Sequence, residues 1–243
     1  MTQPLQQPQG VLNVDKPAGL TSARVVSKVK RLLPKGVKIG HAGTLDPFAT
    51  GVLLLLVGKA TRHCEQLMGQ PKAYDATIKF GATTATDDLE AEEVPWPGAQ
   101  PVTLEAIEQA LERFVGAIQQ RPPVFSALKV GGRRGYDLAR QGDAVELAAR
   151  TVQVYEIEVM EFTWPLLRLR IACGRGTYIR SIARDLGEAL NVGGHLTALR
   201  RTRIGQFHVE QSVTLEKLLA EGAERWLTPV DPAASAPPRE PEV

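Results

Sequence analysis

The strongest restriction on the fold of this sequence comes from the apolar run Val52–Val57, which lies between Gly51 and Gly58. The run is far too short to cross a bilayer, which takes about 20 apolar residues. Its length and composition are typical of a buried strand. The loop directly before it, residues 40–51, is rich in Gly, His and Thr and contains one acid, Asp46. A loop that allows close backbone approach and is anchored to a rigid strand suits a reactive side chain.

The tripeptide Leu45-Asp46-Pro47 also has a simpler interpretation. Proline restricts the residue before it, and aspartate bonds to nearby backbone, so the three residues alone are typical of a turn. No second acid lies near Asp46 in the sequence, which disfavours a glycosidase-type carboxylate pair unless the fold supplies one. The local sequence is compatible both with a simple turn and with a loop that holds Asp46 as a reactive carboxylate.

Several function classes find no support in the sequence. There is no Gly-x-Ser-x-Gly element, no phosphate-binding loop and no dinucleotide fingerprint. Metal-ligand spacing is absent among the histidines, and the two cysteines are far apart; these residues are His41, His63, His195, His208, Cys64 and Cys173. The N-terminus lacks the basic and apolar regions of a signal peptide. We therefore expect a cytoplasmic protein without metal, cofactor, disulfide or membrane anchor.

Hydrophobic periodicity indicates the fold class. Residues 72–81 alternate as a strand should, with Tyr74 heading the apolar face. Further strands are expected within 10–19, where a short strand enters a Pro/Gly turn, and at 152–162, 166–173 and 199–207. Helices are expected at 22–33, 63–68, 103–115, 136–141 and 215–221, and after the loop 174–180 through Ile182–Leu190. These elements interleave without βαβ regularity. The prediction is an α+β fold with a mixed, mostly antiparallel central sheet flanked by helices.

One domain is expected over residues 10–231, between a disordered N-terminus (1–9) and a disordered tail (232–243) rich in Pro, Ala and Glu. Within it, residues 119–150 form a long loop and helix insertion rich in Pro, Gly and Arg, and loops of this length are usually functional. Residues 121–203 hold 14 Lys and Arg against 8 Asp and Glu, although the whole chain carries only +2. Arginine suits phosphate contact and base stacking; a solvated basic face is the alternative.

Arg180 and Tyr74 are candidate partners for Asp46. Arg180 follows the glycine-containing loop 174–177, and an arginine facing a carboxylate keeps it ionised and oriented as a nucleophile. Tyr74 is a possible aromatic platform. Taken alone, a helix-surface arginine and a core aromatic explain these two residues equally well.

Six stretches of the chain resemble the TruB family, the bacterial tRNA pseudouridine-55 synthases. The resemblance runs in order from about Gly10 to Asp231 and is carried by residues 10–22, 38–47, 72–74, 122–129, 174–181 and 199–205. It implies the isomerisation of one uridine in the T-loop of tRNA to pseudouridine. In that reaction the base is flipped out, its glycosidic bond breaks, and the rotated uracil is rejoined to the ribose through C5.

The resemblance also implies roles for single residues. Asp46 matches the catalytic aspartate, Tyr74 the active-site tyrosine that stacks on the uracil, and Arg180 the arginine paired with the aspartate. The substrate-binding positions are matched by His41, which inserts into the T-loop, by Tyr178 and Leu199, and by Lys16, a motif lysine with a more structural role.

Further expectations follow from the resemblance. The partner is the T-arm stem-loop of tRNA, the enzyme acts as a monomer without guide RNA, and no cofactor is needed. Family members often carry a C-terminal PUA domain, which we expect to be absent or vestigial because only Ser212–Asp231 and the tail follow the catalytic region. The alternative function is an RNA-binding or tRNA-folding module in which catalysis is secondary.

Overall fold

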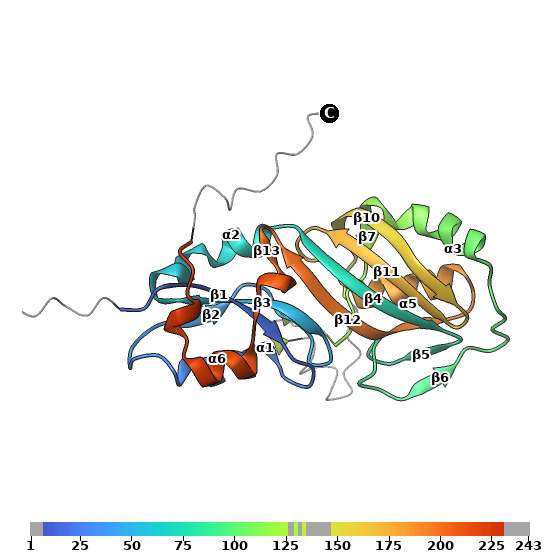
Figure 1. Ribbon diagram of the computed structural model, residues 1–243. Coiled ribbons are helices and arrows are strands. Elements are labelled where there is room, and N and C mark those ends of the chain that lie inside the picture. The colour runs from blue at the N-terminus through green and yellow to red at the C-terminus, as the bar shows by residue number, and fades with distance from the viewer. Residues whose placement is uncertain (1–6, 126–128, 131–132, 135–146, 231–243) are drawn as a thin grey trace, which may run out of the picture. The chain divides into compact units, whose positions relative to one another are not determined.

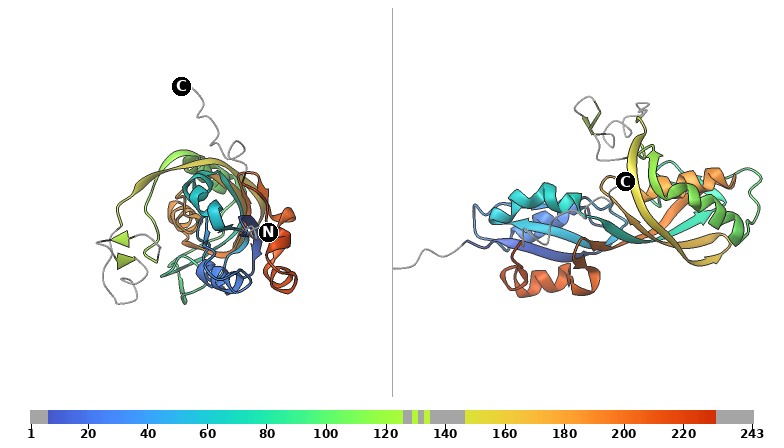
Figure 2. Two further views of the ribbon diagram at one scale, coloured as in Figure 1. Left: turned by 90° about the vertical axis from the view of Figure 1, so that its left-hand side faces the viewer. Right: turned by 90° about the horizontal axis from the view of Figure 1, so that it is seen from above.

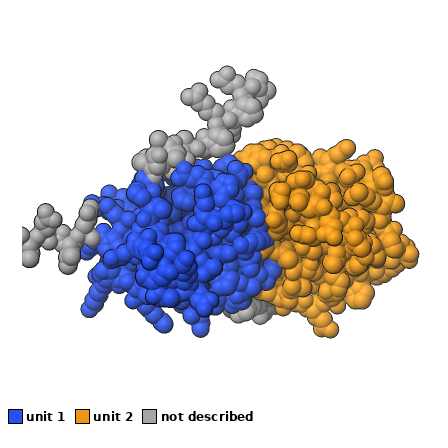
Figure 3. All heavy atoms as spheres, viewed as in Figure 1, with its two compact units in different colours: residues 1–73, 200–243 blue, residues 74–199 orange. Residues whose placement is uncertain are grey.

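A computed structural model of the 243-residue chain describes residues 7–125, 129–130, 133–134 and 147–230. The chain divides into two compact units (Figure 3). Unit 1 comprises residues 1–73 and 200–243, and unit 2 comprises residues 74–199. The chain passes from one unit to the other within strand β4 (Lys72–Phe80) and again within strand β12 (Gly194–Ile204).

Unit 1 is built on strands flanked by short helices (Figure 1). Its strand order is β14-β1-β3-β12, with β2 paired to β3 and β13 to β12. The strands besides β12 are β1 (Gly10–Lys16), β2 (Ile39–His41), β3 (Thr50–Val57), β13 (Phe207–His208) and β14 (Val213–Thr214). The helices are α1 (Ser22–Lys30), α2 (Cys64–Gly69), α6 (Leu215–Glu221) and the 3₁₀ turns η1 (Gly58–His63), η3 (Val209–Gln211) and η4 (Glu224–Trp226).

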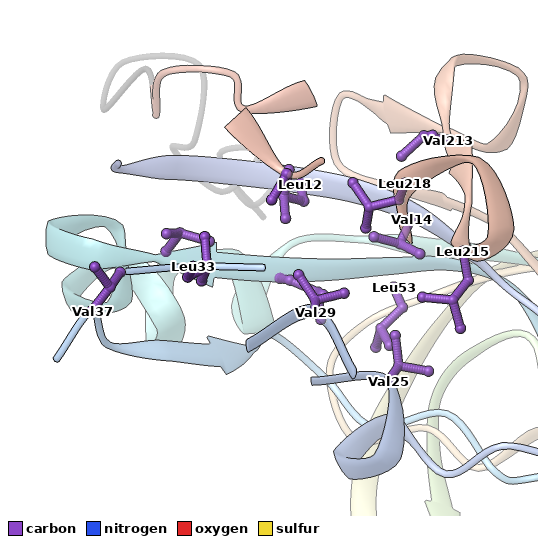
Figure 4. Packing of buried hydrophobic residues seen from close by; sticks show 13 residues of the cluster. Leu12, Val14, Val25, Val29, Leu33, Val37, Leu53, Val213, Leu215 and Leu218 are labelled. Carbon is purple, nitrogen blue, oxygen red and sulfur yellow. The ribbon is translucent and has the colours of Figure 1, made fainter. Parts of the chain in front are cut away.

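The core of unit 1 lies on both faces of the antiparallel pair β1 and β3. Because side chains alternate along a strand, each strand contributes to two apolar clusters. One cluster packs β1 and β3 against α1 and α6 (Figure 4) and includes Leu12, Val14, Val25, Val29, Leu53, Leu55, Leu215 and Leu218. The other includes Val11, Val52, Leu54, Leu56, Ala60 and Leu67 from β1, β3, η1 and α2. Figure 2 shows α2 and α6 on opposite sides of these strands. The predicted buried strand is therefore the centre of unit 1.

Unit 2 has the strand order β12-β4-β11-β10-β7. These are β7 (Gly116–Gln120), β10 (Arg150–Thr163) and β11 (Leu166–Cys173) with the two shared strands, and two separate hairpins, β5 (Ala82–Thr84) with β6 (Glu93–Pro95) and β8 (Lys129–Val130) with β9 (Arg133–Arg134). Its helices are α3 (Leu104–Leu111), α5 (Ile179–Ala189) and the 3₁₀ turn η2 (Glu112–Phe114). Alternate residues of β4 and β11 are buried, and α3 contacts both β10 and α5.

The predicted α+β class with a mixed sheet flanked by helices is confirmed. The pairs β1–β14 and β3–β12 are parallel, whereas β1–β3, β2–β3, β7–β10, β10–β11 and β12–β13 are antiparallel. Thr103 caps α3 through a bond from the Ala106 amide, and α6 has the predicted bounds.

Some predicted bounds were wrong. The helix expected at 103–115 ends at Leu111, where the 3₁₀ turn η2 follows and Val115 is extended. Helix α1 ends at Lys30, because residues 31–33 form tighter turns before Pro34, which disfavours a helical residue ahead of it. The strand expected from residue 199 begins at Gly194, directly after Gly193 turns the chain with a φ of 65°. The helix predicted at Tyr136–Gln141 and the tail 232–243 lie outside the described residues, as do residues 1–6.

Candidate active site

The loop that contains Asp46 is fixed in unit 1 by a side chain of α1. Ser22, the first residue of that helix, is buried, and its Oγ accepts a hydrogen bond from the Leu45 amide at 2.9 Å. The same hydroxyl donates to the Leu45 carbonyl at 3.2 Å. Ala49 N in turn donates to the Asp46 carbonyl at 3.2 Å, which closes a turn around Pro47. The turn interpretation of this segment is thus correct, and the turn fixes the backbone on both sides of Asp46.

Two buried cations hold the rest of this loop. Lys16 Nζ donates to the carbonyls of Pro17, Leu20 and Pro47 at 2.9, 2.8 and 3.1 Å. The Arg201 guanidinium donates to the carbonyls of Gly43, Thr44 and Val52 at 3.1, 3.3 and 2.8 Å. These six bonds satisfy backbone acceptors that would otherwise be costly to bury.

Gly51 makes this arrangement possible at the point where β3 lies against β12. Its φ is +98°, and a Cβ at this position would overlap the backbone of Arg201. Glycine alone meets both demands without strain. The glycine that ends the loop in the sequence is therefore required by the packing of the two strands.

Burial and neighbouring charges perturb two titratable groups beside Asp46. Burial lowers the pKa of Lys16 from 10.5 to about 8, the Asp46 carboxylate opposes this change, and Arg201 adds to it. The carboxylate of Asp46 is therefore within electrostatic reach of the Lys16 ammonium. Burial, with Arg201 as a smaller cause, lowers the pKa of His41 below 6.5, so its imidazole is neutral at pH 7. Among the described residues, His41 Nδ1 has no hydrogen-bond partner.

Arg180 lies in the first turn of α5 in unit 2 and is buried. Its Nη1 is 3.2 Å from Asp88 Oδ2 and donates to the Thr86 carbonyl at 3.0 Å. Its Nη2 donates to the Phe125 carbonyl at 3.0 Å. Two separate segments of unit 2, the turn at Thr86–Asp88 and the segment at Phe125, thus fix the guanidinium. Arg180 is therefore no ordinary surface arginine of a helix.

Asp88 is held as firmly as the arginine that it contacts. Its Oδ1 accepts from Thr86 Oγ1 at 2.6 Å and from the Glu90 amide at 2.9 Å, while Thr84 Oγ1 donates to its carbonyl at 2.8 Å. A buried ion pair is stable only when such bonds satisfy the remaining lone pairs. The Thr- and Asp-rich turn at residues 83–88 therefore holds the Asp88 carboxylate in place beside Arg180.

The neighbouring Asp87 has an unusual backbone conformation and an unusual carboxyl pKa. Its φ is 59°, and its Oδ2 lies 3.0 Å from Arg184 Nη1. Burial raises the pKa of the Asp87 carboxyl from 3.8 to about 6, although Arg184 and Arg180 act in the opposite direction. The turn thus places the Asp88 carboxylate beside Arg180 and the Asp87 carboxylate beside Arg184, one turn further along α5.

Asp87 should make the stability of the protein depend on pH. Because the folded state raises the pKa of this carboxyl to about 6, it binds the proton more tightly than the unfolded chain does. The stability gained is present below about pH 3.8 and lost as pH rises through about 6, in total about 3 kcal/mol at about 1.4 kcal/mol per pKa unit. From about pH 4 to about pH 7, the free energy of unfolding of the wild type should fall by most of this amount relative to that of Asp87→Asn. Urea denaturation of both proteins at a series of pH values measures this difference. Parallel curves would contradict the prediction.

The other predicted residues of unit 2 lie at ends of its elements. Tyr74 is the first residue of the unit, buried on β4, and Leu199 is its last, buried on β12. Tyr178 is the residue at which α5 begins, and the Arg150 guanidinium lies 5.2 Å from the centre of its ring. Cation–π contact of this kind orients an aromatic side chain without covering it.

Within each unit the structure brings some of the predicted residues together. Lys16 and Asp46 are neighbours in unit 1, and Tyr178 and Arg180 share the first turn of α5 in unit 2. Sequence reasoning missed three residues that hold them, namely Ser22, Asp88 and Arg201. For Asp88 the sequence does contain a signal, because residues 83–88 are rich in Thr and Asp, as a hydrogen-bonded turn would be.

In the part of the chain that the structure describes, no three His, Cys, Asp or Glu side chains gather in a way that could hold a metal ion. None of the helices described here has the length and apolarity needed to cross a membrane.

Comparison with known proteins gives consistent matches. A model of the TruB family pseudouridylate synthase N-terminal domain matches residues 30–179, and one of the tRNA pseudouridylate synthase B C-terminal domain matches residues 180–233. The tRNA pseudouridine synthase B of Phocaeicola vulgatus is 50% identical over 212 residues, covering 85% of this chain and 90% of that protein. That of Mycobacterium tuberculosis is 47% identical over 213 residues, covering 86% and 71%.

Solved structures are similar over most of this chain. A chain of a Cbf5–Nop10–Gar1 complex is 36% identical with a TM-score of 0.67, covering 87% of this chain and 54% of that one. A chain of an H/ACA RNP bound to a substrate RNA containing 2′-deoxyuridine is 34% identical with a TM-score of 0.65, covering 87% and 52%. The present chain thus spans about half the length of these two chains.

Proposed function

The chain belongs to the TruB family of pseudouridylate synthases, and from this premise we propose that it isomerises uridine 55, in the T-loop of tRNA, to pseudouridine. That the chain is a tRNA pseudouridine synthase follows from the family and from relatives of that name at about half identity. The choice of nucleotide is the proposal. The choice is supported by the resemblance of six stretches of the chain to the tRNA pseudouridine-55 synthases. The role of Asp46 is supported by its place in a loop whose backbone is fixed by Ser22, Lys16 and Arg201.

The proposal gives each candidate residue a part in the reaction. The Asp46 carboxylate acts on the ribose or the base as the bond between N1 and C1′ breaks; C5 then forms the new bond to C1′, loses its proton, and N1 gains one. Tyr74 stacks on the uracil and takes part in removing the C5 proton. Arg180 is the buried cation of the site. No atom is gained or lost in total, so the reaction needs no oxidant, reductant or group donor.

The energetics of substrate binding support a loop uridine. A base must leave its stack before C1′ can be reached, at a cost of a few kcal/mol that is least for unpaired nucleotides. Stacking on an aromatic side chain returns roughly 1–3 kcal/mol per base. We propose that Tyr74 supplies this contact, that His41 enters the loop as the bases leave it, and that Tyr178 and Leu199 contact the substrate. A neutral imidazole with an unoccupied Nδ1 suits His41 to hydrogen bonding with bases rather than phosphates.

We also propose that the enzyme acts as a monomer on the T-arm stem-loop in the cytoplasm, where tRNA is processed. The excess of arginine in residues 121–203 supports phosphate binding by this segment. Lys16 remains a predicted substrate-binding residue; its three carbonyl contacts favour a role in fixing the Asp46 loop.

A tritium-release assay tests the choice of nucleotide. A T-arm stem-loop carrying tritium at C5 of its uridines should lose the label of one uridine, because C5 exchanges its proton for the bond to C1′. The same RNA with cytidine in place of uridine 55 should release none while binding with similar affinity. Release from the cytidine-containing RNA would show that another uridine is the target.

A further inference from the structure

The start of α5 is not fixed by its own sequence. Tyr178 is the capping residue directly before the helix, its side chain makes no capping hydrogen bond, and the first turn contains no acidic residue. Serine, threonine, aspartate and asparagine are the residues that usually cap a helix from this position, and tyrosine is not among them. Another part of unit 2 must therefore determine where the helix carrying Arg180 begins.

Gln120 supplies the missing contacts from β7. Its Oε1 accepts from the Tyr178 amide at 2.8 Å, and its Nε2 donates to the Tyr178 carbonyl at 3.0 Å. One side-chain amide thus pairs with both backbone groups of one residue, as a neighbouring strand would. Gln120 is the last residue of β7 and is only 1% exposed, so water does not compete for these bonds.

Neighbouring contacts hold the same turn. Arg121, the next residue, accepts through its carbonyl from Ser181 Oγ and from Arg184 Nη2, both at 2.9 Å. Arg150, the partner of Gln120 in the β7–β10 register, donates to the Gly176 carbonyl at 2.8 Å and lies over the Tyr178 ring. The end of β7 and the start of β10 therefore both contact the start of α5 and the loop before it.

We propose that Gln120 is a positioning residue for the pseudouridine synthase reaction, which acts by fixing the Tyr178 backbone and, two residues on, the origin of the Arg180 side chain. The inference rests on the proposed roles of Tyr178 and Arg180. Arg180 must meet three acceptors at about 3 Å, and a shift of its helix start would break that set. Losing about 1 Å of accuracy in such a group costs up to about 100-fold in rate.

Gln120→Met tests the proposal with a side chain of similar size and no polar atoms. We expect the single-turnover rate at saturating T-arm RNA, per folded enzyme, to fall by about 10- to 100-fold, with RNA affinity unchanged within about threefold. The matched control is Gln119→Met in the same strand, because the Gln119 side chain is exposed and donates to Thr151 Oγ1 at 2.7 Å, away from α5. A merely structural role would lower the folded fraction and leave the rate per folded enzyme unchanged.

Gln120→Glu keeps the test decisive even if the methionine variant fails to fold. A protonated glutamic acid can donate to the Tyr178 carbonyl and accept from its amide, as glutamine does, whereas a carboxylate can only accept. The rate relative to the wild type should therefore be near one at about pH 5.5 and fall as pH rises to about 8, since burial raises the pKa of a carboxyl group. Gln119→Glu should keep a flat ratio. A flat ratio for Gln120→Glu as well would overturn the proposal, whereas an inactive wild type would instead refute the proposed function.

Discussion

Asp46→Asn should lower the rate of pseudouridine formation by at least about 1,000-fold, while leaving the fold and the affinity for RNA almost unchanged. A carboxamide has the shape of the carboxylate but neither its charge nor its nucleophilicity. The loop itself should persist, because Lys16, Ser22 and Arg201 bind it through backbone atoms, namely those of Gly43, Thr44, Leu45 and Pro47. The reaction is measured by tritium release and RNA binding by filter retention.

Asp75→Asn is the matched control for this prediction. Asp75 lies on β4 with its side chain 41% exposed beside Arg170, so the same chemical change should alter neither the rate nor the affinity noticeably. If Asp46→Asn instead lowers the melting temperature strongly, Asp46 serves the turn and not the chemistry. Refolding of misfolded tRNA by this variant also separates the two functions, since a tRNA-folding module would retain that activity in full.

The sequence predicted the elements that depend on local pattern. The run Val52–Val57 is a buried strand because each of its residues is apolar, and β4 alternates because its polar and apolar residues do. Thr103 and Leu215–Glu221 were predictable because caps and short amphipathic helices are set within a few residues. The candidates Asp46, Tyr74 and Arg180 were recognisable from the loops and the strand that carry them. Their specific roles came from the resemblance to a family, and these roles remain predictions.

What the sequence could not supply were contacts between distant segments. Ser22 meets Leu45 across 23 positions, Gln120 meets Tyr178 across 58, and Arg201 meets Gly43 across 158. Each of these side chains is unremarkable in its own segment, and only folding brings it to a backbone group that needs a hydrogen-bond partner. The departures at α1 and β12 have a local origin instead, since a proline and a glycine set the ends of elements whose interiors were predicted.

Asp88→Asn should be the most damaging single change in unit 2. It leaves the buried Arg180 guanidinium without the counter-charge that lies 3.2 Å away, and removing one partner of a buried pair costs about 3–5 kcal/mol. In a chain of this size the melting temperature should fall by about 10 °C. The turnover rate of the folded enzyme should fall by more than about 100-fold, because Asp88 orients the arginine. Glu161→Gln is the control: its partner Arg168 is exposed, and the loss should stay below about 1 kcal/mol.

A double variant separates the stability of this pair from its function. Arg180→Met alone leaves the Asp88 carboxylate buried beside Thr86 and Glu90 without its cation, and should be as destabilising as Asp88→Asn. Combined, the two substitutions leave no uncompensated charge, so their joint cost should be smaller than the sum by about 1–3 kcal/mol, measured by urea denaturation. The double variant should nevertheless stay inactive in tritium release, because it regains part of the stability but still lacks the Arg180 guanidinium. Additive costs would show that Asp88 and Arg180 contribute independently, and recovery of activity would show that the arginine is not needed for the reaction.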